Sequence, residues 1–335
     1  MPTNKKSRKA KSSPKNSPVI VVVGSYATGL TMKVERIPGA GETLLGTGYR
    51  VDFGGKGSNQ AVGSARLGAL VKFVAKIGKD TFGDMALELY RKEGVDAAFV
   101  KGSADAPTGV GFIVVEAKSG QNSIAIDPGA NELLTPADVS KAARACKAAS
   151  VVLTQLEIPV EAAQKALELG RSLGAVTILN PAPVRPLPAS VLRLVDVLTP
   201  NEKEARVLAG RSPDVSIEAA IVARDLIRGG VKQVVMTLGE QGALLVDSSQ
   251  QKHFPAIAVK AVDTTGAGDA FNAGLAVALA QGSTIEEAIG FAVVTGAMAV
   301  MKEGVIPSLP RRNEVLAFCK SHAVWAPQWL SRGWK

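Results

Sequence analysis

Short β-branched runs, each followed by a stretch with helical character, recur along the chain and constrain its fold most strongly. The first run, "VIVVVGS" (19–25), is continuously apolar and ends in glycine and serine, which is typical of a strand buried in a parallel sheet. Similar runs lie at 71–78, 150–157, 176–183, 195–202 and 233–240. Helical patterns of Ala, Leu, Glu and Lys lie at 137–149, 159–173, 202–209 and 217–228. The alternation predicts a Rossmann-like α/β domain, with a mostly parallel sheet covered by helices on both faces.

Two segments interrupt this alternation. Residues 29–53 and 107–126 are rich in Gly, Thr and Val, contain turn signals and show no helical pattern. We expect hairpins that pair into a small second sheet. That sheet is either a lid that closes a pocket against water or a plain edge of the fold.

Several of the predicted strands end in polar residues. These are Glu157, Asn180, Asn201 and Thr237. Ligands of parallel α/β sheets bind beyond the carboxyl ends of the strands, so these four residues are candidates for a site by position alone.

The charge of the chain is concentrated at its N-terminus. The net charge is +9, and residues 1–18 contain six Lys or Arg and no acid, which leaves +3 for the remainder. We expect this basic tail to be disordered and solvated, and the charge of the body argues against a nucleic-acid partner. No apolar run approaches the roughly 20 residues that span a bilayer. With only Cys146 and Cys319, a disulfide framework or zinc site is not expected, and the cytoplasm is the expected compartment.

The segment "VDTTGAGDAF" (262–271) places a carboxylate directly after a glycine turn and before an apolar helical run. Gly266, Ala267 and Gly268 can present backbone N–H groups to an anion such as phosphate, at the positive end of the helix dipole. Asp269 could then accept a proton from an attacking hydroxyl. The alternative is that Asp269 is an ordinary N-cap, and this segment alone does not decide between them.

Two further motifs add polar groups suited to a phosphorylated or polyhydroxylated ligand. In "FGGKGSNQAVGSARLG" (53–68), the glycines allow close backbone approach, Lys56 can reach a hydroxyl or phosphate, and Asn59 falls on the first turn of a helix. In "TPNEKEA" (199–205), Asn201 and Glu204 lie three residues apart, so they share a helix face and could order the water shell of Mg²⁺. A glycine turn and a surface helix start are the alternatives.

Together, these motifs resemble the two signatures of the ribokinase family of carbohydrate kinases, within the phosphofructokinase-B superfamily. The shorter motifs "GETL" (41–44), "QLE" (155–157), "NPAP" (180–183) and "TLGEQGA" (237–243) follow the family's order. The resemblance implies a kinase domain at 19–323, with lid segments at about 29–53 and 107–126, and leaves a Trp-containing C-terminal tail at 324–335. It implies ATP-dependent transfer to a sugar hydroxyl, most simply from ATP to D-ribose to give D-ribose 5-phosphate, and a homodimer formed through the lid.

The resemblance also implies roles for individual residues. Asp269 would be the catalytic base, with Gly266, Ala267 and Gly268 as the anion hole. The sugar would be held by Gly55, Lys56, Gly57, Asn59 and Glu157, together with Asp269. The nucleotide would lie against Asn201, Thr237, Gly239, Gly242 and Gly268, with Glu204 bound to Mg²⁺ through water. Potassium would bind beside the anion hole, at Asp263 and Thr265 and near Ala299, Lys302, Gly304 and Ser308.

One position departs from the family pattern. The family usually has an asparagine and an aspartate shortly after the first strand, and both bind sugar hydroxyls; here Ala27 and Gly29 take their places in "GSYATGLTM" (24–32). Tyr26 and Thr28 are the adjacent polar residues that could replace them. Another pentose, a ketohexose or a nucleoside therefore stays open as the acceptor, as does a non-catalytic sugar or nucleotide sensor.

Overall fold

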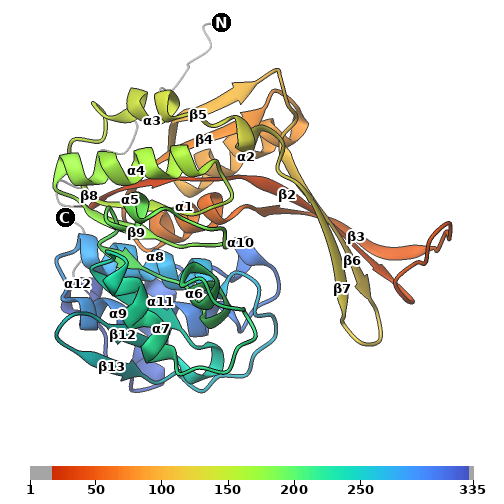
Figure 1. Cartoon of the computed structure of the whole chain (residues 1–335). Helices are drawn as coiled ribbons and strands as arrows, with labels where there is room; N and C mark the ends of the chain where they lie inside the picture. The colour runs from red at the N-terminus through yellow and green to blue at the C-terminus, as the bar shows by residue number, and fades with distance from the viewer. Residues whose placement is uncertain (1–16, 332–335) are drawn as a thin grey trace, which may run out of the picture.

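The computed structural model describes residues 17–331 and forms two sheets, a large one in the body and a small one that projects from it (Figure 1). Residues 1–16 of the basic tail and 332–335 of the C-terminal segment lie outside the described residues, so the expectation of a disordered tail is not addressed by the structure.

The large sheet has nine strands in the order β13-β12-β11-β10-β9-β8-β1-β4-β5. Its seven strands from β11 to β5 are parallel, whereas β12 and β13 are antiparallel to their neighbours. The bounds are β1 (Val19–Val23), β4 (Leu70–Gly78), β5 (Asp96–Ser103), β8 (Ala149–Thr154), β9 (Val176–Leu179), β10 (Val197–Leu198), β11 (Gln233–Thr237), β12 (Ala243–Val246) and β13 (Gln251–Phe254).

Helices cover both faces of this sheet, as the alternating pattern predicts. In β1, Ile20 and Val22 face one hydrophobic core, and Val21 and Val23 face the other. The first core includes α1 (Lys56–Arg66), α2 (Thr81–Glu93), α8 (Ala267–Ala280), α9 (Ile285–Ala299), α10 (Val305–Ser308), α11 (Arg312–Ser321) and α12 (Gln328–Ser331). The second includes α3 (Pro136–Ala142), α4 (Val160–Leu173), α5 (Ala189–Leu192), α6 (Glu202–Leu208) and α7 (Ala219–Arg228). Two 3₁₀ helices are η1 (Gly129–Leu133) and η2 (Gly239–Gln241).

The small sheet, called the lid below, has four strands in the order β3-β2-β6-β7. They are β2 (Ala27–Val34), β3 (Gly46–Gly54), β6 (Gly109–Glu116) and β7 (Asn122–Asp127), drawn from the two segments that lack a helical pattern. The expected fold class, a mostly parallel three-layer domain with a small separate sheet, is therefore confirmed.

The helix predicted at 137–149 is too long. In the structure α3 ends at Ala142, and a series of turns follows in which the N–H of Cys146 bonds to the Ala142 carbonyl. The Ala-rich sequence favours a helix there, but β8 pairs with β1 from Ala149 onward, so the chain must leave the helix before that residue.

The C-terminal segment packs on the body through Trp329. Its ring meets Phe291 of α9 edge-on at 5.0 Å, and its indole N–H donates to the Ser283 hydroxyl at 3.1 Å. Trp325 remains 49% exposed. Within the described residues, no helix is long and apolar enough to cross a membrane.

Candidate active site

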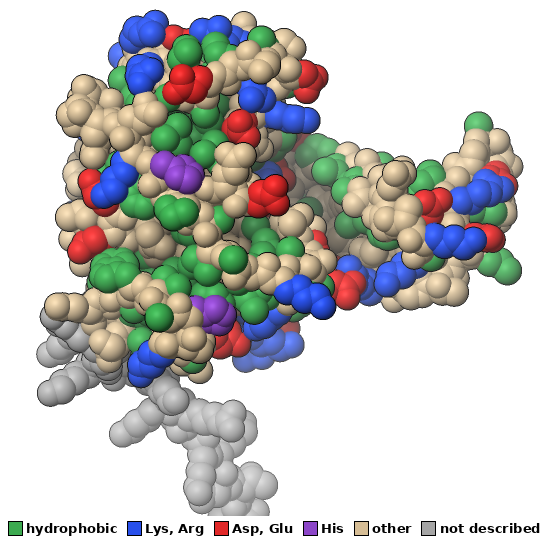
Figure 2. Space-filling model, turned by 90° about the horizontal axis from the view of Figure 1, so that it is seen from below, with side chains coloured by type: hydrophobic (Ala, Val, Ile, Leu, Met, Phe, Trp, Pro, Cys, Tyr) green, Lys and Arg blue, Asp and Glu red, His purple; other side chains and the backbone are tan. Residues whose placement is uncertain are grey.

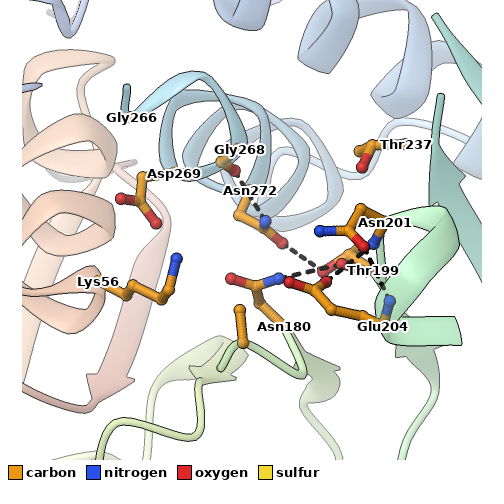
Figure 3. A pocket seen from close by; sticks show the side chains of 11 residues that line it. Lys56, Asn180, Thr199, Asn201, Glu204, Thr237, Gly266, Gly268, Asp269 and Asn272 are labelled. Atoms are coloured by element: carbon orange, nitrogen blue, oxygen red, sulfur yellow. Dashed lines mark hydrogen bonds between the residues drawn. The ribbon is translucent and has the colours of Figure 1, made fainter. Parts of the chain in front are cut away.

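A polar cavity lies beyond the carboxyl ends of the strands in the large sheet (Figure 3). It is lined by Lys56, Asn180, Ala182, Thr199, Asn201, Glu204, Thr237, Gly266, Gly268, Asp269 and Asn272. The motifs from the beginning, middle and end of the sequence therefore meet in one place, as expected for a parallel α/β sheet.

Asp269 lies in the first turn of α8 but does not cap it. The N-cap is Gly266, no side chain caps this end, and the helix begins at Ala267 rather than at Asp269. Only a glycine suits the N-cap, because its φ is +84° and an added Cβ would lie 2.7 Å from Val305 Cγ1. The interpretation of Asp269 as an ordinary N-cap is therefore wrong.

The Asp269 carboxylate is held instead by side chains of α1. Its Oδ2 accepts a hydrogen bond from the Asn59 amide at 2.8 Å, and its Oδ1 accepts one from the Gln60 amide at 2.9 Å. Asp269 is only 6% exposed. Two amide donors fix the orientation of a carboxylate that faces the cavity without neutralising it.

The three residues expected to form the anion hole differ in their placement. Gly266 and Gly268 line the cavity, whereas the Ala267 N–H donates to the Thr264 carbonyl at 3.3 Å. A Cβ added at Gly268 would meet no atom within 4 Å, which means that this backbone is open to a ligand. The positive end of the α8 dipole and the open backbone at Gly268 therefore suit an anion here, whereas the Ala267 N–H is already bonded.

Lys56 begins α1, and Figure 3 shows its ammonium group extending into the cavity near Asp269. Burial by itself would lower the pKa of this ammonium, but the carboxylates of Asp269, Glu157 and Glu204 outweigh that effect and raise the pKa above its ordinary value. Lys56 is therefore charged at neutral pH and suited to an anionic or hydroxyl-bearing ligand.

Glu157 lies beneath the start of α1. Its Oε2 accepts hydrogen bonds from the Ser25 hydroxyl at 2.6 Å and from the Lys56 backbone N–H at 2.8 Å. Gly57 packs so closely on this loop that an added Cβ would lie 2.4 Å from the Ser25 nitrogen. The residues that line the cavity do not include Gly55, Gly57, Asn59 or Glu157. Glu157 instead accepts from the Lys56 N–H, and Asn59 donates to Asp269.

Asn201 and Glu204 face the opposite side of the cavity, where they form a capping box. The Glu204 N–H donates to Asn201 Oδ1 at 2.8 Å, and the Asn201 N–H donates to Glu204 Oε2 at 2.9 Å. Burial raises the pKa of the Glu204 carboxyl, against the lowering effects of the Asn201 N–H and of the Lys56 charge. Asn201 and Glu204 therefore begin a helix, as the alternative interpretation of their motif held, and they also line the cavity.

Other residues implied for nucleotide and cation binding are spread more widely. Thr237 lines the cavity, but Gly239 and Gly242 do not. Asp263 accepts hydrogen bonds from the N–H groups of Thr265 at 2.9 Å and Gly304 at 3.0 Å, which ties two loops together beside Gly266.

The remaining cation candidates make other contacts. The Lys302 ammonium pairs with the Glu314 carboxylate at 3.3 Å, and the backbone N–H of Lys302 donates to the Ala299 carbonyl at 3.4 Å. The Ser308 hydroxyl donates to the Val305 carbonyl at 2.8 Å.

The sequence motifs missed three polar residues of the site. Thr199 donates to Asn272 Oδ1 at 2.6 Å, Asn272 donates to the Gly268 carbonyl at 2.8 Å, and Gln60 joins Asp269 to Asn180. Asn180 could be selected only by its place at the end of a strand. Gln60 lies within one glycine motif and Asn272 directly follows the other, but the direction of their side chains toward the site depends on how α1 and α8 pack together.

Tyr26 and Thr28 do not replace the missing polar pair. Both are 0% exposed, and their hydroxyl groups lie 3.1 Å apart in a hydrogen bond. Burial raises the pKa of Tyr26 to about 12. These two side chains belong to the core, so neither can contact a ligand in the cavity.

The sequence matches the model of the pfkB family of carbohydrate kinases over residues 18–312. Together with the polar cavity, the helix N-terminus and the buried carboxylate already described, this match defines the class of the protein. The chain belongs to the pfkB family, and the resemblance seen in the sequence motifs is confirmed.

Within this family, the chain is similar to ribokinases and deoxyribokinases. It is 36% identical to the ribokinase of Haemophilus influenzae over 302 residues, which cover 89% of this chain and 97% of that one. It is also 36% identical to the deoxyribokinase of Salmonella typhi, covering 89% and 98% of the two chains. The solved structure of Arabidopsis thaliana ribokinase complexed with ribose and ATP is 33% identical, with a TM-score of 0.83 over 91% of this chain and 99% of that chain.

Proposed function

We propose that this chain is an ATP-dependent ribokinase, which converts D-ribose and ATP to D-ribose 5-phosphate and ADP. The observation that carries the proposal is the buried carboxylate of Asp269, which lies in the first turn of α8 beside the open backbone of Gly268. Asn59 and Gln60 of α1 orient this carboxylate by donating hydrogen bonds to it. The Haemophilus influenzae relative is a ribokinase, and the Arabidopsis thaliana structure holds ribose and ATP, which supports the choice of both substrates.

In the proposed reaction, Asp269 accepts the proton of the sugar hydroxyl as that oxygen attacks the γ-phosphorus of ATP. A bond forms between the sugar oxygen and phosphorus, and the bond from phosphorus to the β,γ-bridging oxygen breaks, so ADP leaves with the electron pair. The N-terminus of α8 stabilises the charge on the transferred group, and Lys56 adds its positive charge from α1. Glu157, Gly55, Gly57 and Asn59 hold the sugar or the groups that touch it.

Mg²⁺ fits the opposite side of the cavity. Glu204 uses Oε2 for the Asn201 N–H, which leaves its second oxygen for a metal-bound water, and Mg²⁺ prefers such oxygen donors while keeping several waters. When bound to the ATP phosphates, Mg²⁺ would neutralise part of their charge. Asn201, Thr237, Gly239 and Gly242 are the residues we assign to the nucleotide side.

A potassium ion is the proposed monovalent activator. The support is the junction of the Asp263 and Gly304 loops beside Gly266, where the Asp263 carboxylate accepts hydrogen bonds from the N–H groups of Thr265 and Gly304. Asp263 and Thr265, with groups near Ala299, Lys302, Gly304 and Ser308, would supply the oxygen ligands. An ion there would act on the anion hole electrostatically.

We also propose a cytoplasmic homodimer that forms through the lid. The lid exposes Tyr49, Phe112, Ile124 and Ile126 by 62%, 53%, 55% and 68%. By strand register, Phe112 lies on one face of the lid and Ile124 and Ile126 on the other, and a partner chain that packs on the lid would remove such exposed apolar side chains from water. Both cysteines are free and buried, which suits a reducing compartment. Sedimentation equilibrium of the wild type should give twice the chain mass, and replacing Phe112 and Ile126 by Ser should give the monomer mass.

2-Deoxy-D-ribose is the second candidate acceptor. The deoxyribokinase of Salmonella typhi is as similar to this chain as the ribokinase of Haemophilus influenzae, at 36% identity each. Ala27 and Gly29 also lack groups that could bind sugar hydroxyls. A site that makes fewer bonds to hydroxyls discriminates less between a sugar and its deoxy analogue.

An acceptor screen tests the proposed function. ADP release is measured with ribose, 2-deoxyribose, fructose, tagatose and several nucleosides, each with and without potassium. We expect the highest kcat/KM with ribose. A higher kcat/KM with 2-deoxyribose would establish the second candidate, and ligand-induced stabilisation without ADP release from any acceptor would show a binding protein in place of a kinase.

A further inference from the structure

One face of the lid, called the inner face below, lies toward the end of the body where α8 begins. Arg50 of β3 shows this, because its Nη1 donates to Glu303 Oε1 at 2.6 Å, and Glu303 directly precedes the Gly304 that bonds to Asp263. We define the inner face as the side of the lid that carries Ala27, Gly29, Arg50 and Asp52. Figure 2 shows a hollow between the body and the projecting lid, on the side where the two approach each other.

Near the body, most paired positions of the inner face on β2, β3 and β6 carry small residues, although Gly111 also pairs with the large Ile126 of β7. Ala27 pairs with Gly54 and Gly109, and Gly29 pairs with Asp52 and Gly111. A Cβ added at Gly111 would meet no atom within 4 Å. These small residues leave room for a ligand between the lid and Lys56, which follows Gly54 by only two positions.

Asp52 is the one carboxylate among the paired positions of this face, because Glu116 pairs with Val34 and Asp127 with Val110 on the other face. Directly opposite residues of antiparallel strands project from the same side, so Asp52 projects beside the empty position at Gly29. It lies two residues, or about 7 Å, along β3 from Gly54.

The Asp52 carboxylate is held in place by hydrogen bonds that involve only one of its two oxygens. Its Oδ2 accepts hydrogen bonds from Arg50 Nε at 2.7 Å and from the Thr31 hydroxyl at 3.4 Å, while its side chain stays 33% exposed. A carboxylate offers about four acceptor sites, so Oδ1 is available for a ligand. Arg50 is itself anchored to Glu303, which fixes the carboxylate relative to the body.

We propose that Asp52, positioned by Arg50, is the lid residue that recognises the acceptor, by accepting hydrogen bonds from its hydroxyl groups. The carboxylate that β2 lacks at Gly29 is supplied from the opposite strand. This inference rests on the proposed sugar kinase activity and concerns which group of the lid selects the acceptor. It also explains why Tyr26 and Thr28 can be buried without loss of a polar group toward the sugar.

Kinetics of Asp52→Ala test the proposal. We expect the KM for the acceptor to rise roughly tenfold to a hundredfold, as for the loss of hydrogen bonds to a charged group, whereas the KM for ATP stays within about twofold. Glu116→Ala removes a carboxylate from the other face of the same sheet and should leave both KM values unchanged. The double variant Gly29→Asp, Asp52→Ala moves the carboxylate to the opposite strand, where an added Cβ has only ordinary contacts of 3.6 Å, and should restore much of the acceptor affinity.

Three outcomes would overturn the proposal. One is an acceptor KM of Asp52→Ala within twofold of wild type, and another is an equal rise in the KM for ATP, which would indicate general damage to the lid. If Asp52→Ala does not fold, Asp52→Val is compared in its place, because valine suits a strand and accepts no hydrogen bond, and an unchanged acceptor KM would again contradict the proposal. Absence of ADP release by the wild type with every sugar would instead refute the proposed function, and is seen before any variant is made.

Discussion

Asn59 and Asp269, which are 210 residues apart in sequence, are joined by a hydrogen bond of 2.8 Å from the amide of one to the carboxylate of the other. The bond connects the first turn of α1 to the first turn of α8, and Gln60 adds a second bond from the same helix. The two glycine motifs of the sequence therefore act as one unit. One motif provides the carboxylate, and the other orients it.

Gln60 is expected to position Asp269 without touching substrate. It is 0% exposed, its Nε2 donates to both Asp269 and Asn180, and its Oε1 accepts from Gln155. In Gln60→Met, the free energy of unfolding should fall by about 1–3 kcal/mol, because buried polar partners lose their bonds. The value of kcat should fall more than either KM changes. Gln164→Met, on the surface of α4, should alter neither stability nor kcat, and equal kinetics for both variants would contradict the positioning role.

Gly268 and Gly266 should respond differently to alanine. At Gly268 the new methyl group meets no protein atom within 4 Å and projects into the proposed phosphate site. Gly268→Ala should therefore keep the unfolding temperature of wild type but raise the KM for ATP or lower kcat. Gly266→Ala adds a clash with Val305 at a φ of +84°, and should cost about 1–2 kcal/mol of stability or more. Thermal unfolding and steady-state kinetics of the pair check both expectations. Wild-type kinetics for Gly268→Ala would exclude that glycine from the phosphate site.

The strands and the glycine turn before Asp269 could be predicted from the sequence because their signals are local. The run Val19–Val23 is β-branched throughout, and the glycines before Asp269 mark a turn whatever surrounds them. Gln60 and Asn272 could not be assigned in this way, since each is a polar residue inside a helix and its role depends on the face that the neighbouring helix covers. The end of α3 was misjudged for the same reason. That helix ends at Ala142 because β8 must pair with the distant strand β1, and not because a local residue breaks the helix.

Glu93 should make stability depend on pH. Arg66 donates two hydrogen bonds to it, at 2.7 and 3.0 Å, and these lower the pKa of its carboxyl. A depressed folded-state pKa stabilises the protein above the unfolded value of about 4.3, and this contribution is lost as the pH falls through the folded value. Glu93→Gln should therefore be less stable than wild type at pH 7, by about 1–3 kcal/mol, and the difference should shrink below about pH 4.

The matched control for this prediction is Glu88→Gln on the same helix. Glu88 pairs with Arg91 in solvent, so its loss should change stability little at either pH. Urea unfolding at pH 7 and pH 3 measures all three proteins. A Glu93→Gln difference that grows toward low pH would contradict the assigned sign.

Potassium should activate the enzyme through the loops that Asp263 joins. Replacing sodium by potassium at constant ionic strength should lower the KM for ATP by about fivefold or more, the usual scale of coupling between two sites. Asp263→Ala removes the carboxylate that bonds to Thr265 and Gly304, and should abolish the difference between the two ions. Equal activity in both salts for the wild type would refute the cation site.

The central claim is that Asp269 removes the proton from a sugar hydroxyl that receives the phosphoryl group. The most direct measurement is ³¹P NMR of reactions with ribose and Mg·ATP, which follows sugar phosphate and ADP together, for wild type and for the nearly isosteric Asp269→Asn. We predict one sugar phosphate per ADP for the wild type and a rate lower by about 10²–10⁴-fold for the variant, with the fold retained. Sugar phosphate formation by Asp269→Asn at close to the wild-type rate would contradict the account.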